Sequence, residues 1–381
     1  MNYNYNHFFD HYIGHETSEM IRLISQGHNS DVIRAHSEQF PNEIDHANRH
    51  GCTPLMLASV MANLDVIKLL IDLGADLKKK NKDDQSILWV TCFYARTPEH
   101  LTAIRFLLDH GADPNEMGGI FDFPLLVSFC QDIRTEFSVD IISLLVSYGA
   151  NINVKLIEMY NQTPLMSVLS DFYTKLTPQE ADIKFKMVEF FLSQKTLDLS
   201  ARTKIGYNVL MYAATEDSSD PKIVDLILKT GIDINAQKEG GETVLHLAIF
   251  QAPLSVIRLL LENKINVNIE NKNGCIALEL ICFHRHNRKE VREIARLLLH
   301  YGSHVNHRAS NGKTVLDKYV NHFTDYDKEL VMIFLEYGAE TNFFFQKKKC
   351  TFQEYIDRKI QKCQIYHHYD KIISSRNSQK K

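Results

Sequence analysis

Short apolar segments alternate with polar ones along most of the chain, and they come in pairs. Gly51–Ala58 opens one apolar segment, Leu64–Ile71 forms the next, and Gly74 follows it. Apolar positions three and four apart place one side of a helix against a neighbour. This pattern predicts two short helices joined by a turn and ended by a glycine.

The same unit recurs along the chain. The position of Thr53 can serve as a ruler, because an equivalent residue returns every 33 to 45 residues. These positions are Thr53, Ser86, Phe123, Thr163, Asn208, Thr243, Ile276, Thr314 and Thr351. The end of the unit also recurs, as a glycine after a leucine-rich segment, at Gly111, Gly149, Gly231, Gly302 and Gly338. A fixed period of this length indicates a repeat architecture.

The residues at the ends of these segments suit helix termini. Thr53 can accept hydrogen bonds from free backbone N–H groups, and Pro54 occupies a first-turn position where no donor is needed. Gly74 can take the left-handed conformation that ends a helix. Because one such unit cannot bury its own apolar face, neighbouring units must stack.

The unit resembles the ankyrin repeat, with its pattern G-x-T-P-L-H-x-A-A, a loop, x-V-V-x-L-L-L and then G-A-D-V-N. The resemblance covers about residues 15–363 and implies an all-α solenoid of helix-turn-helix units with β-hairpin loops. We expect about eight full repeats plus caps. The expected organisation is an N-terminal segment with capping helices at 1–47, the repeat array at 48–342, and a C-terminal capping helix with a basic tail at 343–381.

Several units depart from the family pattern. Phe123, Asn208 and Ile276 stand in place of the threonine. Other residues replace the usual histidine, at Trp89, Leu126, Met211, Glu279 and Asp317. These changes predict weaker hydrogen bonding between loops. Extra residues fall mostly between the two helices of a unit, at 131–136 and 171–180, where we expect insertions.

Composition fits a globular protein, since 44% of the 381 residues are apolar and 24% are charged. The first residues lack the order of a signal peptide, so we expect a cytoplasmic protein, with secretion into a host cell without a cleavable signal as an extension. The seven cysteines are scattered and odd in number, which argues against a disulfide framework.

Net charge is uneven, because residues 346–381 carry ten Lys or Arg against three acids within a total of −4. This tail could contact nucleic acid or anionic lipid. We favour the alternative that these charges lie on the solvent-exposed face of the C-terminal cap. Nucleic acid is therefore not an expected partner, and the tail is only a weak indication of membrane binding.

Two features of the sequence resemble parts of catalytic or metal motifs. Gly312-Lys313-Thr314 resembles the end of a phosphate loop, but His307 stands where an earlier glycine is required. The histidines at 7, 11 and 15 and those between 284 and 307 could gather a metal, yet helix-end histidines usually meet solvent or a carbonyl. We therefore expect no enzyme, catalytic residue, cofactor, metal or small-molecule substrate.

In the ankyrin family a partner generally meets the hairpin tips and the groove side of the first helices. Carried over to this chain, the tip candidates are Arg49, His50, Lys82, Tyr160, Lys204 and Glu239. The groove candidates are Phe93, Tyr94, Phe250, Phe283 and His284. Aromatic side chains are enriched in interface anchors. The alternative is that these rings pack beneath the inter-helix insertions.

The resemblance thus implies a protein-interaction module whose partner is a protein, with a host-cell protein as the extension of that expectation. A divergent array of this composition resembles ankyrin proteins of intracellular bacteria or large viruses. Two alternatives stay open. The chain could be a regulatory or inhibitory subunit of an enzyme, or it could be a substrate of an asparaginyl hydroxylase at hairpin residues such as Asn153, Asn235 and Asn268.

Overall fold

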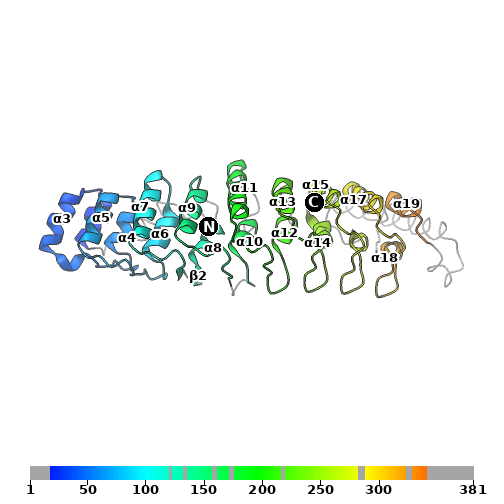
Figure 1. The fold of residues 1–381 in the computed structure, drawn as a ribbon, viewed down its shortest axis with the longest axis horizontal. Helices are drawn as coiled ribbons and strands as arrows, with labels where there is room; N and C mark the ends of the chain where they lie inside the picture. Colours follow the sequence, from blue (N-terminus) through cyan, green and yellow to red (C-terminus); the bar gives the residue numbers. More distant parts are fainter. Residues whose placement is uncertain are drawn as a thin grey trace, which may run out of the picture. The chain divides into compact units, whose positions relative to one another are not determined.

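The computed structural model describes residues 18–340 except 120–121, 132–134, 157–160, 171–175, 216–218, 282–287 and 323–327. The chain forms two compact units, Met1–Lys204 and Ile205–Lys381. The described residues hold nine helix pairs, five in the first unit and four in the second (Figure 1). The all-α repeat architecture expected from the sequence is confirmed.

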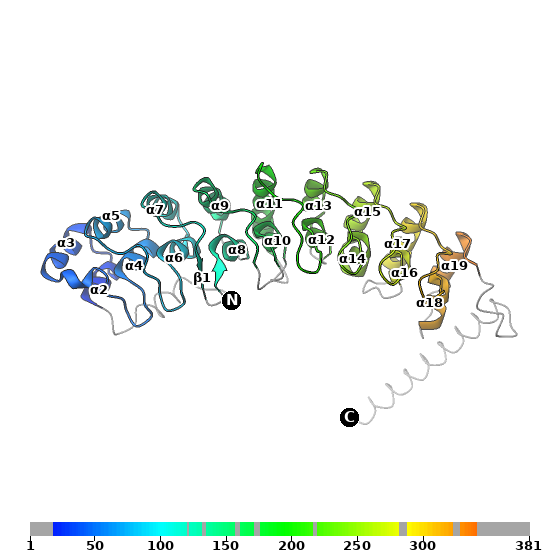
Figure 2. The same ribbon diagram turned by 60° about the horizontal axis from the view of Figure 1, so that its bottom comes forward.

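In the first unit the helices form two layers (Figure 2). The first helix of each pair contacts the first helix of the next pair, and the second helices contact one another in the same way. The first layer is α2 (Glu19–Ser25), α4 (Pro54–Val60), α6 (Ile87–Tyr94), α8 (Leu125–Cys130) and α10 (Pro164–Leu169). The second layer is α3 (Ser30–Gln39), α5 (Leu64–Asp72), α7 (Pro98–Asp109), α9 (Ser138–Ser147) and α11 (Pro178–Ser193). A 3-10 turn, η1 (Pro41–Glu43), follows α3.

The second unit repeats this arrangement. Its first layer is α12 (Val209–Ala213), α14 (Val244–Gln251), α16 (Ala277–Leu280) and α18 (Val315–His322). Its second layer is α13 (Pro221–Leu228), α15 (Leu254–Glu262), α17 (Arg288–His300) and α19 (Lys328–Glu336). One two-stranded sheet is described, in the first unit, where β1 (Met117–Gly118) pairs with β2 (Phe123–Pro124) antiparallel.

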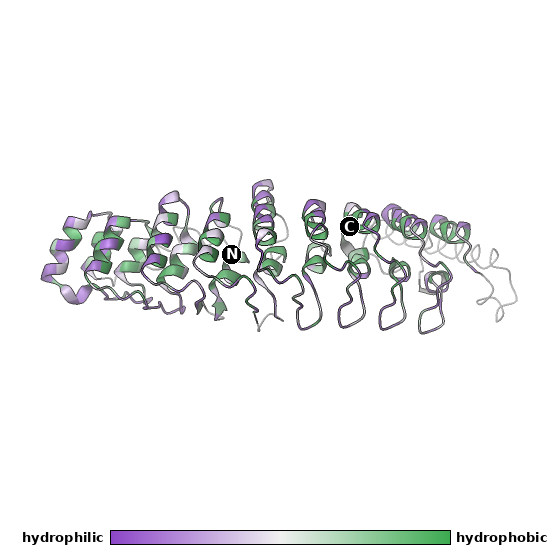
Figure 3. Cartoon of the chain, in the orientation of Figure 1, coloured by the Kyte–Doolittle hydropathy of each residue, from purple (hydrophilic) through white to green (hydrophobic). Residues whose placement is uncertain are grey.

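The core lies between the two layers and between successive pairs. In the second-layer helices, hydrophobic residues alternate with hydrophilic ones, as Figure 3 shows along α11. On α5, Val66, Ile67 and Leu70 are buried while the helix also carries charged Asp65 and Lys68. Each pair therefore buries its apolar side only against its neighbours, which is the physical reason for the stack.

The N-terminal helical pair was expected as a cap, and α2 and α3 occupy that place before Pro41. Ser18 begins α2 by accepting a hydrogen bond from the backbone of Ile21. Met20 and Ile24 on α2 are buried. The expected C-terminal cap near Thr351 and the basic tail lie outside the described residues.

The prediction of an inserted loop at 171–180 is partly wrong, because the last residues of this range are helical. Helix α11 begins at Pro178, and its N-cap Thr177 forms a reciprocal capping box with Glu180. Thr177 Oγ1 accepts from the Glu180 backbone at 3.2 Å, and Glu180 Oε2 accepts from the Thr177 backbone at 2.7 Å. The S/T-x-x-E signal was present in the sequence and starts a helix earlier than the repeat register implied.

At several divergent positions the replacing residue still bonds the backbone at the start of its own helix, whereas the weaker bonding predicted between loops stays a prediction. Asn208 accepts a bond from the Met211 backbone at 2.9 Å, so it caps α12 as a threonine would. Glu279 accepts from the Ile276 backbone at 3.1 Å, and Asp317 accepts from the Thr314 backbone at 3.0 Å. These carboxylates satisfy the same free donors near a helix start.

Candidate functional site

The hairpin tips are shaped by buried asparagines that are not themselves candidates for partner contact. Asn48 Oδ1 accepts from the backbones of His50 at 2.9 Å and Cys52 at 3.0 Å. Asn81 and Asn271 make the same pair of bonds in their own hairpins. An asparagine that bonds its own backbone two residues on makes a tight turn. The tip backbone is therefore held in one conformation.

Successive tips are also bonded to one another. In the first unit the Lys82 backbone N–H donates to the His50 carbonyl at 2.9 Å. In the second unit Lys272 donates to Gly240 at 2.9 Å, and Ser310 donates to Asn273 at 3.1 Å. Such bonds link these neighbouring tips through the main chain, so the tips that they join form a connected edge rather than independent loops.

A glycine permits this close approach. Gly51 has φ +80°, and a Cβ at that position would lie 2.8 Å from the backbone nitrogen of Lys82. Gly241 has φ +79° and would place a Cβ 2.8 Å from the nitrogen of Lys272. Both the left-handed backbone and the contact exclude a side chain.

We expect Gly51→Ala to lower the free energy of unfolding by about 1–3 kcal/mol, because it adds left-handed strain and a backbone clash. Gly74→Ala is the matched control, since Gly74 has φ +89° but a Cβ there meets nothing within 4 Å. The measurement is urea unfolding of the two variants. Equal losses would show that the tip-to-tip contact contributes nothing beyond the backbone conformation.

The predicted tip residues that the structure describes lie where the sequence placed them, at the ends of the hairpins. Arg49 and Lys82 are exposed in the first unit, and Arg49 Nε lies 3.0 Å from Nε2 of the half-buried His50. Lys204 and Glu239 are exposed as well. Tyr160 lies outside the described residues.

The predicted groove residues divide by burial. Phe93 and Phe250 are half-buried, whereas Tyr94 is 8% exposed. This burial favours the packing alternative for Tyr94 and leaves Phe93 and Phe250 as accessible rings. Phe283 and His284 lie outside the described residues.

Phe93 belongs to an aromatic cluster that sequence reasoning missed. Its ring is parallel to Trp89 with centroids 5.5 Å apart, and it meets Phe129 edge-on at 6.3 Å. Trp89 Nε1 is buried and has no hydrogen-bond partner among the described residues. A Cβ on Gly119 would lie 3.1 Å from the Trp89 ring. The sequence did hold a signal for this cluster, since the single tryptophan of the chain stands where the ankyrin pattern often has histidine.

The carboxyl of Glu116 sits beside this cluster. Burial raises its pKa, and the Ser86 hydroxyl that bonds to it acts in the opposite direction. Ser86 also caps α6 by accepting from the Trp89 backbone at 3.1 Å. Glu116 thus joins one hairpin to the start of the preceding repeat's first helix, which is a structural role.

A ladder of asparagines connects the ends of successive repeats. Asn153 donates to the Thr196 carbonyl at 2.7 Å and accepts from the Asp198 backbone at 2.8 Å. Asn268 makes equivalent bonds to Gly302 and His304, each at 2.9 Å. The resemblance suggests these amides as hydroxylation sites, and in the structure both are bonded to the next repeat.

His246 holds the expected histidine position and forms a buried bridge. Its Nδ1 accepts from the Thr243 backbone at 3.2 Å, and its Nε2 lies 3.0 Å from the Cys275 carbonyl of the next repeat. Bonding to a carbonyl places the proton on Nε2. Burial is the largest cause of the lowered pKa of His246.

Because the folded state disfavours the protonated ring, unfolded chains should take up the proton first as the pH falls. The contribution of neutral His246 to the free energy of unfolding is intact above the unfolded pKa of about 6.5. It declines as the pH falls towards the lower pKa of the folded state. We expect stability to drop between about pH 7 and pH 5, and to drop less in His246→Gln, which cannot titrate. Urea unfolding across this range measures it. An unchanged pH slope in the variant would contradict the assignment.

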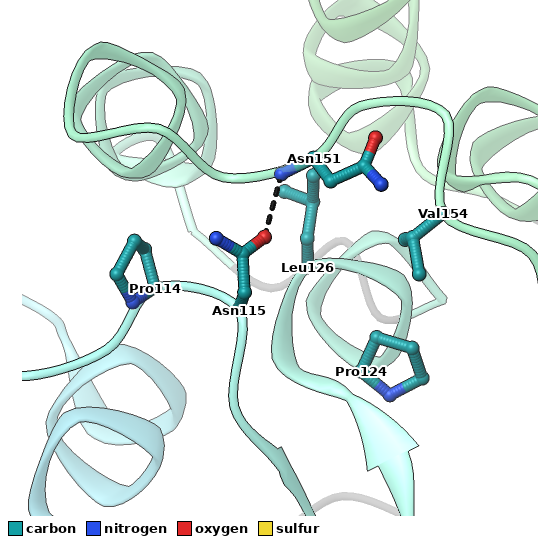
Figure 4. Close-up of a pocket in the computed structure, with 6 residues that line it drawn as sticks. All are labelled: Pro114, Asn115, Pro124, Leu126, Asn151 and Val154. Atoms are coloured by element: carbon teal, nitrogen blue, oxygen red, sulfur yellow. Dashed lines mark hydrogen bonds between the residues drawn. The ribbon is translucent and has the colours of Figure 1, made fainter.

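A pocket of about 310 Å³ lies in the first unit among the loops after α7 and α9 and the start of α8. It is lined by Pro114, Asn115, Pro124, Leu126, Asn151 and Val154 (Figure 4). Asn115 Oδ1 accepts from the Asn151 backbone at 2.7 Å, and its Nδ2 donates to Gly149 at 2.9 Å. The lining has no titratable side chain, so it offers no acid–base chemistry.

Within the described ranges, no three His, Cys, Asp or Glu side chains are grouped so that they could hold a metal ion. No helix in the described part of the chain is both long and apolar enough to span a membrane.

Comparisons with known proteins agree with the repeat architecture. The family model described as ankyrin repeats (3 copies) matches residues 18–118, 179–271 and 210–309, which together exceed half of the chain. An ankyrin repeat protein of Acanthamoeba polyphaga mimivirus is 25% identical over 228 residues, covering 58% of this chain and 29% of that protein. A second mimivirus ankyrin repeat protein is 24% identical over 258 residues, covering 62% and 31%.

The chain spans less than a third of the length of these curated relatives. Among solved structures, the human ASB11 ankyrin repeat domain is 20% identical, with a TM-score of 0.49. That alignment covers 66% of this chain and 99% of the ASB11 chain.

Proposed function

The chain belongs to the ankyrin repeat family, and on that premise we propose that it binds a partner protein through its hairpin tips and the adjoining side of its first-layer helices. Ankyrin repeats are generally protein–protein interaction modules. The contact residues are then Arg49, His50, Lys82 and Phe93 in the first unit, and Glu239 and Phe250 in the second.

The observation that carries the proposal is the connected edge of tips. The bond from the Lys82 backbone to the His50 carbonyl and the bonds made by Asn48 hold exposed charged side chains on a fixed backbone. A surface ordered before binding loses less conformational entropy when a partner docks. Half-buried Phe93 adds apolar area of the kind found in binding hot spots.

We further propose that the protein acts in the cytoplasm and that its partner is a protein of a host cell. The likeness to two mimivirus ankyrin repeat proteins supports this part of the proposal. The proposed binding needs no cofactor and no small-molecule substrate.

The test is a pull-down with quantitative mass spectrometry that compares the wild type with Arg49→Glu/Lys82→Glu. We expect less of the true partner to be recovered with the variant than with the wild type. Its association with the variant should also be slower and depend less on salt, because exposed charges at the rim of an interface mainly accelerate the encounter of the two proteins. Lys186→Glu is the control, since Lys186 is exposed on second-layer helix α11. A partner retained equally by all three proteins would refute binding at the tips. Recovery of an enzyme whose activity changes would identify a regulatory subunit.

A further inference from the structure

A thiol and an amine from neighbouring repeats meet in the second unit. Cys275 lies in the hairpin before α16, and Lys318 lies on α18 of the next repeat. Lys318 Nζ donates to Cys275 Sγ at 3.1 Å. The two residues are 43 positions apart, so the stack alone brings them together.

Ionisable groups lie beside this pair, and one of them, Glu279, is buried. Lys318 is 6% exposed and Glu279 is 1% exposed, with Nζ and Oε1 3.5 Å apart. The other oxygen of Glu279 lies 3.5 Å from Nδ1 of His307, whose Nε2 bonds to Glu270 at 3.0 Å. Glu279 Oε1 is buried and accepts no hydrogen bond in the described structure. The Lys318 ammonium, at ion-pair distance, therefore offsets part of the cost of burying this carboxylate.

Cys275 differs from the other described cysteines in its access to solvent. Cys52, Cys92 and Cys130 are buried, whereas Cys275 is half-buried. Burial raises the pKa of the Cys52 thiol to about 12 and raises those of Cys92 and Cys130 as well. Since the thiolate is the reactive form, these three thiols are expected to be inert.

We propose that Cys275 is a site of oxidation by hydroperoxides, with Lys318 as the proton donor for the step. The Cys275 thiolate sulfur attacks the terminal oxygen of the hydroperoxide, so an S–O bond forms and the O–O bond breaks. The Lys318 ammonium gives its proton to the departing alkoxide or hydroxide. The products are a Cys275 sulfenic acid, an alcohol or water, and a neutral Lys318 amine. Sulfur loses the two electrons that the peroxide gains, and the sulfenic acid is reversible by thiols.

The consequence would fall on the contact between repeats. The Cys275 backbone carbonyl receives the His246 bond from the preceding repeat, and its side chain receives the Lys318 bond from the following one. Oxygen added to the sulfur would have to be accommodated beside the Lys318 amine, which already contacts Sγ at 3.1 Å. Oxidation at this position therefore reaches the packing of three successive repeats.

The test uses the full chain carrying Cys282→Ser, because Cys275 and Cys282 fall on one tryptic peptide between Lys272 and Arg285. Folded protein is treated with hydrogen peroxide and dimedone, which captures sulfenic acid, and labelling at each cysteine is followed by peptide mass spectrometry. Cys275 should be labelled about tenfold or more faster than Cys52, Cys92 and Cys130. Lys318→Met should slow Cys275 labelling by about tenfold or more, as loss of a general acid does.

Three controls make the result specific. Lys313→Met removes a half-buried lysine outside the contact and should leave the rate unchanged. Lys318→Arg keeps the positive charge but does not release its proton, so its rate should also fall. In urea the effect of Lys318→Met should vanish, because the pair exists only in the fold. Equal labelling of all described cysteines in folded protein, or an unchanged rate in Lys318→Met, would overturn the proposal.

Discussion

Replacing Leu260 by alanine lowers the free energy of unfolding by about 2–5 kcal/mol, as expected for a leucine that leaves a cavity. Leu260 is 0% exposed on α15, where it faces the interior with Val256 and Ile257. Leu70 on α5 is equally buried, and Leu70→Ala should cost the same in the first unit. Urea unfolding measures the loss.

The control for this pair is Leu259→Ala. Leu259 is the neighbour of Leu260 on the same helix but is half-buried, so its truncation should cost clearly less. Hydrogen exchange adds a spatial readout, because repeat arrays couple mainly through nearest neighbours. Leu260→Ala should accelerate exchange in α13, α15 and α17 before distant helices. Uniform acceleration over every repeat would refute local coupling.

Replacing Tyr94 by alanine should be as costly, at about 3–5 kcal/mol for a buried aromatic side chain. The neighbouring Phe93→Ala should cost less stability, because its ring is half-buried and rests on Trp89. If Phe93 anchors the partner, the same truncation should weaken binding by about 2 kcal/mol or more. Adjacent rings on one helix are therefore expected to have opposite effects.

Two measurements on the same variants separate these roles, namely melting temperature and partner affinity. Tyr94→Phe serves as the control, since it keeps the ring and removes only the hydroxyl. Tyr94→Ala should melt earlier, and the fraction that remains folded should bind normally. A Phe93→Ala variant that loses stability as Tyr94→Ala does, and binds with unchanged affinity, would remove Phe93 from the proposed surface.

Local signals in the sequence were sufficient to predict the helix pairs. Thr53 and Pro54 mark the start of α4, and Gly74 marks the end of α5, because capping and left-handed glycine depend on a few adjacent residues. The same reasoning was incomplete at α11, where Thr177 and Glu180 start the helix inside a predicted insertion. The repeat register and the capping signal disagree at this helix, and the structure follows the capping signal.

The candidate surface was predictable in position, but the exposure of its aromatic rings was not. A hairpin-tip residue such as Arg49 stays exposed when the repeats stack, so its position within the repeat is enough to predict its exposure. Phe93 and Tyr94 are adjacent in sequence, yet one ring is half-buried and the other is buried, since exposure depends on which neighbours cover each side of the helix. Spacing within one repeat carries no information about those neighbours.

The sequence by itself determined that this chain is a stack of ankyrin repeats, because the period, the caps and the apolar faces are all short-range features. Only the tertiary structure decided which residues of different repeats meet. The bond from Lys82 to His50 and the contact of Lys318 with Cys275 join residues 32 and 43 positions apart. Such contacts form only after stacking has set the register between repeats. The close approach of the two backbones and the pairing of buried charges then determine which residues of neighbouring repeats bond to one another.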